Sequence, residues 1–146
     1  MNTLSVTFET IDSLNIDAIA IALVANRGQL SRALSLLDWR MCGLISHYIE
    51  SGDITGARNE LVLLPTLGRV AASRCFFFGF GDERSLESRI EEKIDWMRSS
   101  LQSALVESCA FIFPDYPSQV TLVAHELLQG NHSFKYHGIF ANNSIN

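Results

Sequence analysis

The sequence predicts a three-layer α/β/α domain, with a mixed sheet between two layers of helices. Short apolar runs typical of buried strands alternate with longer segments whose apolar residues recur every three or four positions. The run Arg74–Gly81 contains four phenylalanines and a cysteine without polar alternation, the pattern of a strand covered on both faces. No repeat or low-complexity linker interrupts the 146 residues, so we expect one domain, 1–146, whose tail frays at about 138–146.

Composition and charge narrow the class of protein. Hydrophobic residues make up 47% of the chain and charged residues 18%, which is ample apolar material for a core. The net charge of −5 argues against a nucleic-acid partner, because such proteins normally carry a basic patch. The alternative is that arginines of the N-terminal half gather in space and bind nucleic acid. These arginines are Arg27, Arg32, Arg40, Arg58, Arg69 and Arg74.

No stretch of the sequence predicts a membrane segment or an export signal. The longest apolar stretches, Ile16–Ala25 and Cys75–Phe80, are too short to span a bilayer. Met1–Glu9 lacks the basic start and apolar middle of a signal peptide. We therefore expect a cytoplasmic protein without a membrane partner.

The first third of the chain predicts two strands. Leu4–Phe8 alternates apolar and polar residues, which is typical of a half-buried edge strand, and a polar turn through Asp12 and Ser13 follows. Ala18–Val24 is continuously apolar and predicts a buried strand. Asn26–Gly28 then breaks this pattern.

One amphipathic helix, or two, is predicted from Leu30 onward. Asp38 is a candidate N-cap for a second helix beginning at Trp39, and Ser51-Gly52 is the expected stop. The apolar positions that share one helical face are Leu30, Leu34, Leu37, Met41, Leu44 or Ile45, and Tyr48.

The middle of the chain predicts a hairpin-like return and a long helix. Leu61–Pro65 predicts a short strand, closed by a proline that cannot donate to the sheet. A turn at Leu67–Arg69 leads to Arg74–Gly81, which we place at the centre of the sheet. The helix that follows should pack its apolar stripe on the sheet. The stripe consists of Leu86, Ile90, Ile94, Met97, Leu101 and Leu105.

The last third predicts a strand, a helix and a docking tail. Cys109–Pro114 predicts a buried strand ended by proline, and a helix should run from Pro117 to Gly130. The tail from His132 onward is expected to dock locally and to offer an exposed aromatic surface. Its apolar residues are Phe134, Tyr136, Ile139 and Phe140.

The glycines at the end of the phenylalanine run are the candidate ligand site. Gly79, Phe80 and Gly81 are predicted to lie at a strand-to-helix turn, where backbone N–H groups can bind a phosphate. The motif lacks a third glycine at dinucleotide spacing and a phosphate-binding lysine, and Asp82-Glu83 would repel an anion. The competing interpretation is that the glycines serve only the turn and close packing.

No catalytic or metal-binding set emerges from the other residues. His132 and His137 fit neither a helical pair nor a zinc-finger spacing. Ser46, His47 and Glu50 cannot form a triad, because adjacent helical residues do not face each other. We predict no catalytic residue, no metal ligand and no cofactor. The three cysteines stand in apolar surroundings and are predicted to be reduced, buried thiols: Cys42, Cys75 and Cys109.

Three segments in this order resemble the N-terminal domain of the leucyl aminopeptidases of peptidase family M17. Residues 37–60, with Glu50–Gly56 and Asn59-Glu60, resemble the helix, the Gly-Asp-Phe-x-Gly turn and the Gly-Glu step of that domain. Arg74–Gly81 is similar to the family's hydrophobic strand ending in Gly-Leu-Gly. Residues 126–136 resemble the end of its last helix, although Glu126 and His132 replace the usual glycine and tyrosine.

This resemblance implies a fold related to macro domains. It also implies that the chemistry of the family lies in a C-terminal domain, with two metals held by Lys, Asp and Glu side chains. The signature Asn-Thr-Asp-Ala-Glu-Gly-Arg-Leu of that domain is absent from this sequence. We therefore expect no peptidase activity from this chain.

Three hypotheses of function follow. The first is a non-catalytic, stand-alone relative that acts through protein association, either with itself or with a full-length aminopeptidase. The second is a macro-type module that binds a small ligand such as a nucleotide or ADP-ribose. The third is that the chain is the N-terminal fragment of a metallo-aminopeptidase.

Overall fold

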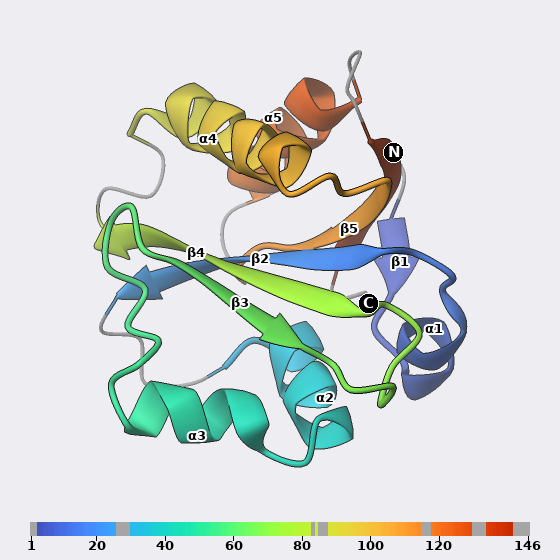
Figure 1. Ribbon diagram of the computed structural model, residues 1–146. Coiled ribbons are helices and arrows are strands. Elements are labelled where there is room, and N and C mark those ends of the chain that lie inside the picture. Colours follow the sequence, from blue (N-terminus) through green and yellow to red (C-terminus); the bar gives the residue numbers. More distant parts are fainter. Residues whose placement is uncertain are drawn as a thin grey trace.

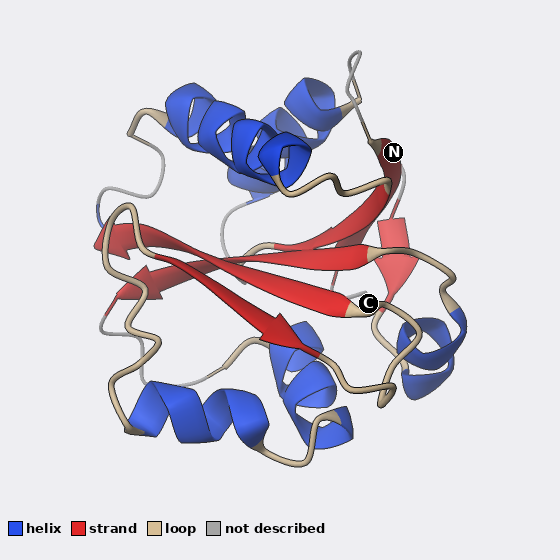
Figure 2. Ribbon diagram, in the orientation of Figure 1, coloured by secondary structure: helices blue, strands red, loops and turns tan. Residues whose placement is uncertain are grey.

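The computed structural model describes residues 3–25, 30–82, 84, 88–114, 118–129 and 134–141. One six-stranded sheet lies between two layers of helices, which confirms the predicted three-layer α/β/α architecture (Figures 1 and 2). The strands are β1 (Thr3–Ser5), β2 (Ala18–Ala25), β3 (Leu61–Pro65), β4 (Arg74–Asp82), β5 (Ser108–Ile112) and β6 (Lys135–Ala141). The helices are α1 (Phe8–Ser13), α2 (Arg32–Arg40), α3 (Leu44–Glu50), α4 (Ile90–Ser103) and α5 (Ser118–Leu128).

The sheet is mixed, with strand order β1-β6-β5-β2-β4-β3. All neighbouring strands are parallel except β3 and β4, which pair antiparallel. The phenylalanine run in β4 therefore lies one strand in from an edge, and the predicted central position is wrong. Its burial was predicted correctly, because Phe76, Phe77 and Phe78 are at most 3% exposed.

Each face of the sheet packs against its own set of helices. Phe76, Phe78 and Phe80 of β4 belong to the core under α4 and α5. Cys75 and Phe77 point to the opposite core, to which α1, α2 and α3 contribute (Figure 1). The alternation follows from the two-residue period of a strand, and helices on both faces explain why the run contains no polar residue.

The start of the chain differs from its prediction. The first strand ends at Ser5, and α1 begins where the continuing strand and the polar turn were expected. Thr7 is the N-cap of α1, because its hydroxyl oxygen accepts from the Thr10 N–H at 3.1 Å. Ile11 of α1 is buried in the core. The alternation in Leu4–Phe8 resembled a strand only because a cap residue stands between two apolar positions.

Two helices occupy the amphipathic segment, but Asp38 does not begin one. α2 continues to Arg40, and the turn before α3 contains Cys42 and Gly43, which both have positive φ. The Asp38 carboxylate instead accepts from the Ser46 N–H at 3.0 Å and from the Ser46 hydroxyl. Asp38 therefore caps the first turn of α3 from the preceding helix, because Gly43 at the start of α3 has no side chain that could do so.

The C-terminal part contains a strand that the sequence patterns did not predict. Strand β6 lies between β1 and β5, parallel to both. Phe134, Ile139 and Phe140 are at most 5% exposed, so the expected exposed aromatic surface of the tail is wrong. Leu105 lies beyond α4 and is 82% exposed, although it was predicted to continue the buried stripe. The predictions for Asn26–Gly28, Leu86, Pro117, Gly130 and His132 fall outside the described residues.

An ion pair joins the amino ends of β2 and β4. Arg74 Nη2 lies 2.6 Å from Asp17 Oδ2, and Arg74 Nη1 donates to the Ala104 carbonyl at 2.8 Å. The Glu107 N–H donates to the same Asp17 oxygen at 3.1 Å. Burial raises the pKa of Asp17, but hydrogen bonds from Arg74, Glu107 and Ser73 and the Arg74 charge outweigh burial and hold the pKa below its ordinary value.

In the described part of the chain, no helix has the length and apolar content needed to cross a membrane.

Candidate functional site

A cavity of about 280 Å³ opens at the carboxyl ends of the parallel strands β2 and β5. Leu23 and Val24 of β2 line one side of it, and Ile112–Pro114 at the end of β5 line the other. The start of α2, Ile49 of α3 and residues 54–56 complete the wall. In open α/β sheets this end of the strands is where ligands usually bind.

The described wall of this cavity is uncharged and mainly apolar. Its polar side chains are Ser31 and Thr55. The Ser31 hydroxyl oxygen caps α2 by accepting from the Leu34 N–H at 3.2 Å. The Thr55 hydroxyl donates to Glu60 Oε2 at 2.7 Å. Such a wall suits an apolar or uncharged small group better than a free phosphate.

The loop beside the cavity already holds an anion from its own chain. Glu60 Oε1 accepts from the N–H groups of Thr55 at 2.8 Å and Gly56 at 3.1 Å. With the Thr55 hydroxyl, the carboxylate receives three hydrogen bonds, the kind of coordination that a bound phosphate would receive. Glu60 therefore fixes this loop internally, and it gives the Asn59-Glu60 step a structural role.

Gly79, Phe80 and Gly81 lie within β4, so the predicted strand-to-helix turn at these residues is wrong. The Gly79 N–H donates to the Glu60 carbonyl at 2.7 Å, and the Gly81 N–H donates to the Gly56 carbonyl at 2.9 Å. Phe80 is 1% exposed. A phosphate bound by these two N–H groups would have to displace both hydrogen bonds. Ligand binding by this segment stays a prediction.

The glycines of this segment let the Glu60 loop approach the strand. A Cβ on Gly79 would lie 1.8 Å from the Ala57 carbonyl oxygen, far inside van der Waals contact. Gly81 has a φ of +83°, a conformation that glycine adopts at little cost. The sequence pattern did not reveal this packing, because the loop and the strand are about twenty residues apart along the chain.

The outer edge of β3 is a second candidate surface. Leu61 and Leu63 are 43% and 49% exposed, and β3 contains no charged residue. An apolar sequence at the edge of a sheet is unusual, because edge strands normally carry charges that prevent pairing with other chains. The uncharged composition of Leu61–Pro65, followed by its proline, is the sequence signal that could have indicated this surface.

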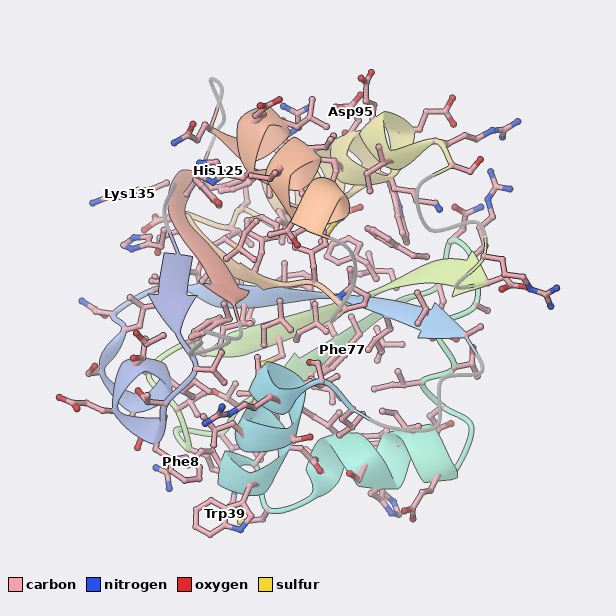
Figure 3. All side chains as sticks on the ribbon, turned by 180° about the vertical axis from the view of Figure 1, so that it is seen from behind. Phe8, Trp39, Phe77, Asp95, His125 and Lys135 are labelled. Atoms are coloured by element: carbon pink, nitrogen blue, oxygen red, sulfur yellow. The ribbon has the colours of Figure 1, made fainter. Side chains whose placement is uncertain are left out.

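An exposed aromatic pair lies on helices α1 and α2. The ring centroids of Phe8 and Trp39 are 5.0 Å apart. Phe8 is 42% exposed and Trp39 is 67% exposed. Figure 3 shows the two side chains next to each other beside α1 and α2. The adjacent Arg40–Asp12 ion pair, at 2.8 Å, gives this patch a charged border.

Comparison with known proteins decides the family. The profile of the cytosol aminopeptidase family, N-terminal domain, matches residues 18–136. The chain belongs to this family. A probable cytosol aminopeptidase of Sulfurihydrogenibium sp. (strain YO3AOP1) is 20% identical over 137 residues, which cover 90% of this chain and 27% of that protein. The chain thus spans about a quarter of the length of this relative.

Solved structures share the fold of this cytosol aminopeptidase domain. A mutant of tomato leucine aminopeptidase aligns over 96% of this chain and 32% of that chain, with a TM-score of 0.66 and 13% identity. The macrodomain of Mycobacterium tuberculosis DarG aligns over 90% and 93%, with a TM-score of 0.63 and 10% identity. The predicted resemblance to the aminopeptidase N-terminal domain and the macro-like fold are both confirmed.

The three cysteines of this family member differ in exposure. Burial raises the pKa of the Cys75 thiol to about 12 and raises the pKa of Cys109. Cys42 is exposed, so its predicted burial is wrong, and Arg69 Nη1 donates to its Sγ at 2.8 Å. The chain leaves the core in the turn after α2, and Cys42 is part of that turn.

Buried His125 of α5 and half-buried Tyr136 of β6 form a pair. His125 Nδ1 lies 2.8 Å from the Tyr136 hydroxyl, and burial lowers the pKa of His125. His137 lies in β6, and burial and the Lys135 charge lower its pKa. Within the described ranges, no three His, Cys, Asp or Glu side chains are grouped to hold a metal ion.

The described arginines do not form one basic surface. Arg40 pairs with Asp12, and Arg74 pairs with Asp17. Arg69 lies near Arg40, whose Nη2 donates to the Arg69 carbonyl at 3.4 Å. Arg27 falls outside the described residues. The absence of a nucleic-acid partner stays a prediction.

Proposed function

We propose that this chain is a non-catalytic member of the cytosol aminopeptidase family that acts through protein association. The observation that carries the proposal is the outer edge of β3. Leu61 and Leu63 of this strand are exposed, and among the described residues no strand pairs with its outer side. An edge of this kind binds another strand through main-chain hydrogen bonds and alternate side chains. Its partner is either a second copy of the chain or a full-length cytosol aminopeptidase.

The Phe8–Trp39 pair supports association less strongly. It offers two exposed aromatic rings, which are favourable groups in protein interfaces. However, both residues lie on helices, whose main-chain groups are largely paired within the helix. The β3 edge offers apolar side chains and unpaired main-chain groups together.

The non-catalytic part of the proposal rests on the chemistry of the side chains. Two-metal hydrolysis needs several carboxylates that converge on one cavity. The cavity at the ends of β2 and β5 has an uncharged described wall. Purified chain should not hydrolyse leucine p-nitroanilide above the blank in the presence of Mn²⁺ or Zn²⁺. Hydrolysis that EDTA abolishes would overturn this part.

Association is tested with the intact chain in two measurements. Light scattering after size-exclusion chromatography should give a mass above the 16.3 kDa of one chain as the concentration rises. In parallel, the chain should be passed over an immobilised full-length cytosol aminopeptidase, with an unrelated immobilised protein as the control. A strict monomer that also fails to bind the aminopeptidase contradicts the proposal.

A small-ligand function is the second candidate, because the cavity lies at the ligand-binding end of the parallel strands. One structure of similar fold is the Oceanobacillus iheyensis macrodomain with ADP, with a TM-score of 0.51 and 9% identity. Calorimetry with ADP and ADP-ribose tests whether this chain binds such ligands. Absence of heat at millimolar ligand would contradict this candidate.

Matched variants separate the two possible ligand positions. Ile49→Trp narrows the cavity, whereas His47→Trp adds a ring on the exposed side of the same helix. Gly79→Val tests the predicted Gly79-Phe80-Gly81 segment. A ligand of the cavity should lose affinity with Ile49→Trp and retain it with His47→Trp. Equal affinity in these two variants would place the ligand elsewhere.

A further inference from the structure

We propose that two copies of this chain associate by pairing their β3 strands antiparallel, which joins the two sheets edge to edge. The inference rests on the proposed association function, and it names the surface and the partner. It depends on which main-chain groups of β3 face outward and on what lies opposite them in a second copy.

Two hydrogen bonds fix which residues of β3 direct their main-chain groups toward β4. The Thr66 N–H donates to the Ser73 carbonyl at 3.0 Å, and the Gly79 N–H donates to the Glu60 carbonyl at 2.7 Å. Both pairs obey the register of the β3 and β4 strands. In an antiparallel ladder, hydrogen-bonded residues alternate with residues whose N–H and C=O point to the other side. The even-numbered residues of β3 therefore face β4.

The odd-numbered residues of β3 present their main-chain groups to the outside. Leu61 and Leu63 each offer an N–H and a C=O, and Pro65 offers only a C=O. The missing donor of Pro65 thus lies on the free edge, and the pairing with β4 is complete without it. This edge carries two donors and three acceptors in the described strand.

A second copy satisfies both donors when the twofold axis passes beside Leu63. Each Leu63 N–H then donates to the Leu63 carbonyl of the other copy, and each Leu61 N–H donates to the Pro65 carbonyl of the other copy. This register gives four hydrogen bonds, and it leaves the Leu61 carbonyl of each copy without a main-chain donor, because the opposite Pro65 has no N–H. An isologous contact of this kind closes at two copies and does not propagate into a fibre.

The side chains and charges of the edge also match a second copy. Leu61 and Leu63 lie on the same face as Phe76 and Phe78, with which they are in register. Antiparallel pairing brings the two leucine pairs together and removes part of their exposed area from water. No charge in β3 opposes its own copy, and the preceding Glu60 carboxylate is already bound to Thr55 and Gly56.

The experiment compares the dissociation constants of matched variants by sedimentation equilibrium. Leu63→Lys places two like charges across the twofold axis, so we expect at least a tenfold weaker dimer. Leu122→Lys is the control, because Leu122 is 46% exposed but lies on α5. The control should leave the dissociation constant unchanged within about twofold. Thermal melts of both variants confirm that they fold.

The possible outcomes separate this inference from the proposed function. A dimer that Leu63→Lys weakens and Leu122→Lys does not weaken supports β3 pairing. A dimer that is insensitive to Leu63→Lys overturns β3 pairing and leaves protein association standing. A chain that stays monomeric at every concentration also overturns β3 pairing, and capture by a full-length aminopeptidase then decides whether the proposed function survives.

Discussion

The two edges of the sheet are built differently. At one edge, β1 has three residues, Thr3–Ser5, and the chain then turns into α1. The other edge is β3 (Figure 1), which has five uncharged residues. Its Leu61 and Leu63 are exposed. A very short strand is one of the ways in which proteins prevent edge pairing. The β1 edge has this protection, whereas β3 is longer and uncharged, and only Pro65 at its end limits pairing.

This difference supports the proposal that the β3 edge serves binding. Exposed leucines cost little free energy in the isolated chain, but they make an edge strand prone to pair with another chain. The loop before β3 is also held firmly, because Glu60 accepts three hydrogen bonds and Gly79 admits Ala57 against β4. The edge is therefore rigid before a partner arrives, which lowers the entropy cost of binding.

The largest expected effect comes from opposite charges at residue 63. Leu63→Lys alone and Leu63→Glu alone should each be monomeric, because like charges meet across the twofold axis. Mixing the two variants should restore a dimer, since each charge then meets its opposite. Sedimentation of the single variants and of the mixture measures this effect. The same pair of charges at Ser5, on the β1 edge, should change nothing.

Restored association at Ser5 but not at residue 63 would mean that the wrong edge has been assigned. A mixture of the Leu63 variants that remains monomeric would remove Leu63 from the interface.

The next largest effect is on stability, through the loop that positions β3. Gly79→Ala should lower the free energy of unfolding by about 3 kcal/mol, because the added Cβ collides with the Ala57 carbonyl. Gly68→Ala is the control: Gly68 has positive φ but open space around its Cβ position, so we expect a loss of about 1 kcal/mol. Urea unfolding of both variants provides the measurement. Equal losses would show that the close approach of the loop is unimportant.

A smaller effect is expected from the ion pair at the Pro65 end of β3. Asp17→Asn should cost about 2 kcal/mol at neutral pH, less than a fully buried pair because both side chains keep about a quarter of their exposure. The folded pKa of Asp17 is lowered, so its contribution is complete above the unfolded pKa and is lost as the pH falls through the folded pKa. The wild type and Asp17→Asn should therefore converge in stability as the pH falls through the lowered pKa of Asp17.

Thermal melts of both proteins between about pH 7 and pH 2 follow this convergence. A difference in stability that stays constant over the whole range would show that the Asp17 charge does not contribute.

The smallest effect concerns the cap of α2 at the rim of the cavity. Ser31→Ala should cost about 1 kcal/mol, because the Leu34 N–H loses its acceptor. Ser35→Ala, on the exposed face of the same helix, should be neutral or stabilise by a few tenths of a kcal/mol. Chemical unfolding of the two variants distinguishes them. Equal values would remove Ser31 as the functional cap.

Local sequence patterns predicted the parts of the fold in which local and tertiary preferences agree. The continuously apolar runs Ala18–Val24 and Cys109–Phe113 became β2 and β5, and Ile94, Met97 and Leu101 became the buried stripe of α4. The predictions failed where the deciding partner is distant. Strand β6 is defined by parallel pairing with β1 and β5, and its mixed composition gives no two-residue alternation.

The candidate sites show the same limit. The ligand role of the Gly79-Phe80-Gly81 segment stays a prediction, and the contact of Gly79 with the loop at Ala57 depends on the fold. The cavity brings together the ends of β2 and β5 with the start of α2, which are separate segments in the sequence. The exposure of Leu61 and Leu63 depends on β3 being an edge strand, and strand order is set by tertiary packing.

Amide hydrogen exchange at β3, followed by NMR over a range of protein concentrations, tests β3 pairing most directly. Val62 and Leu64 face β4 and should stay protected at every concentration. The amides of Leu61 and Leu63 should exchange slowly in concentrated protein and rapidly after dilution below the dissociation constant. Exchange of Leu61 and Leu63 that is rapid at all concentrations, while the chain is dimeric, would contradict pairing through this edge.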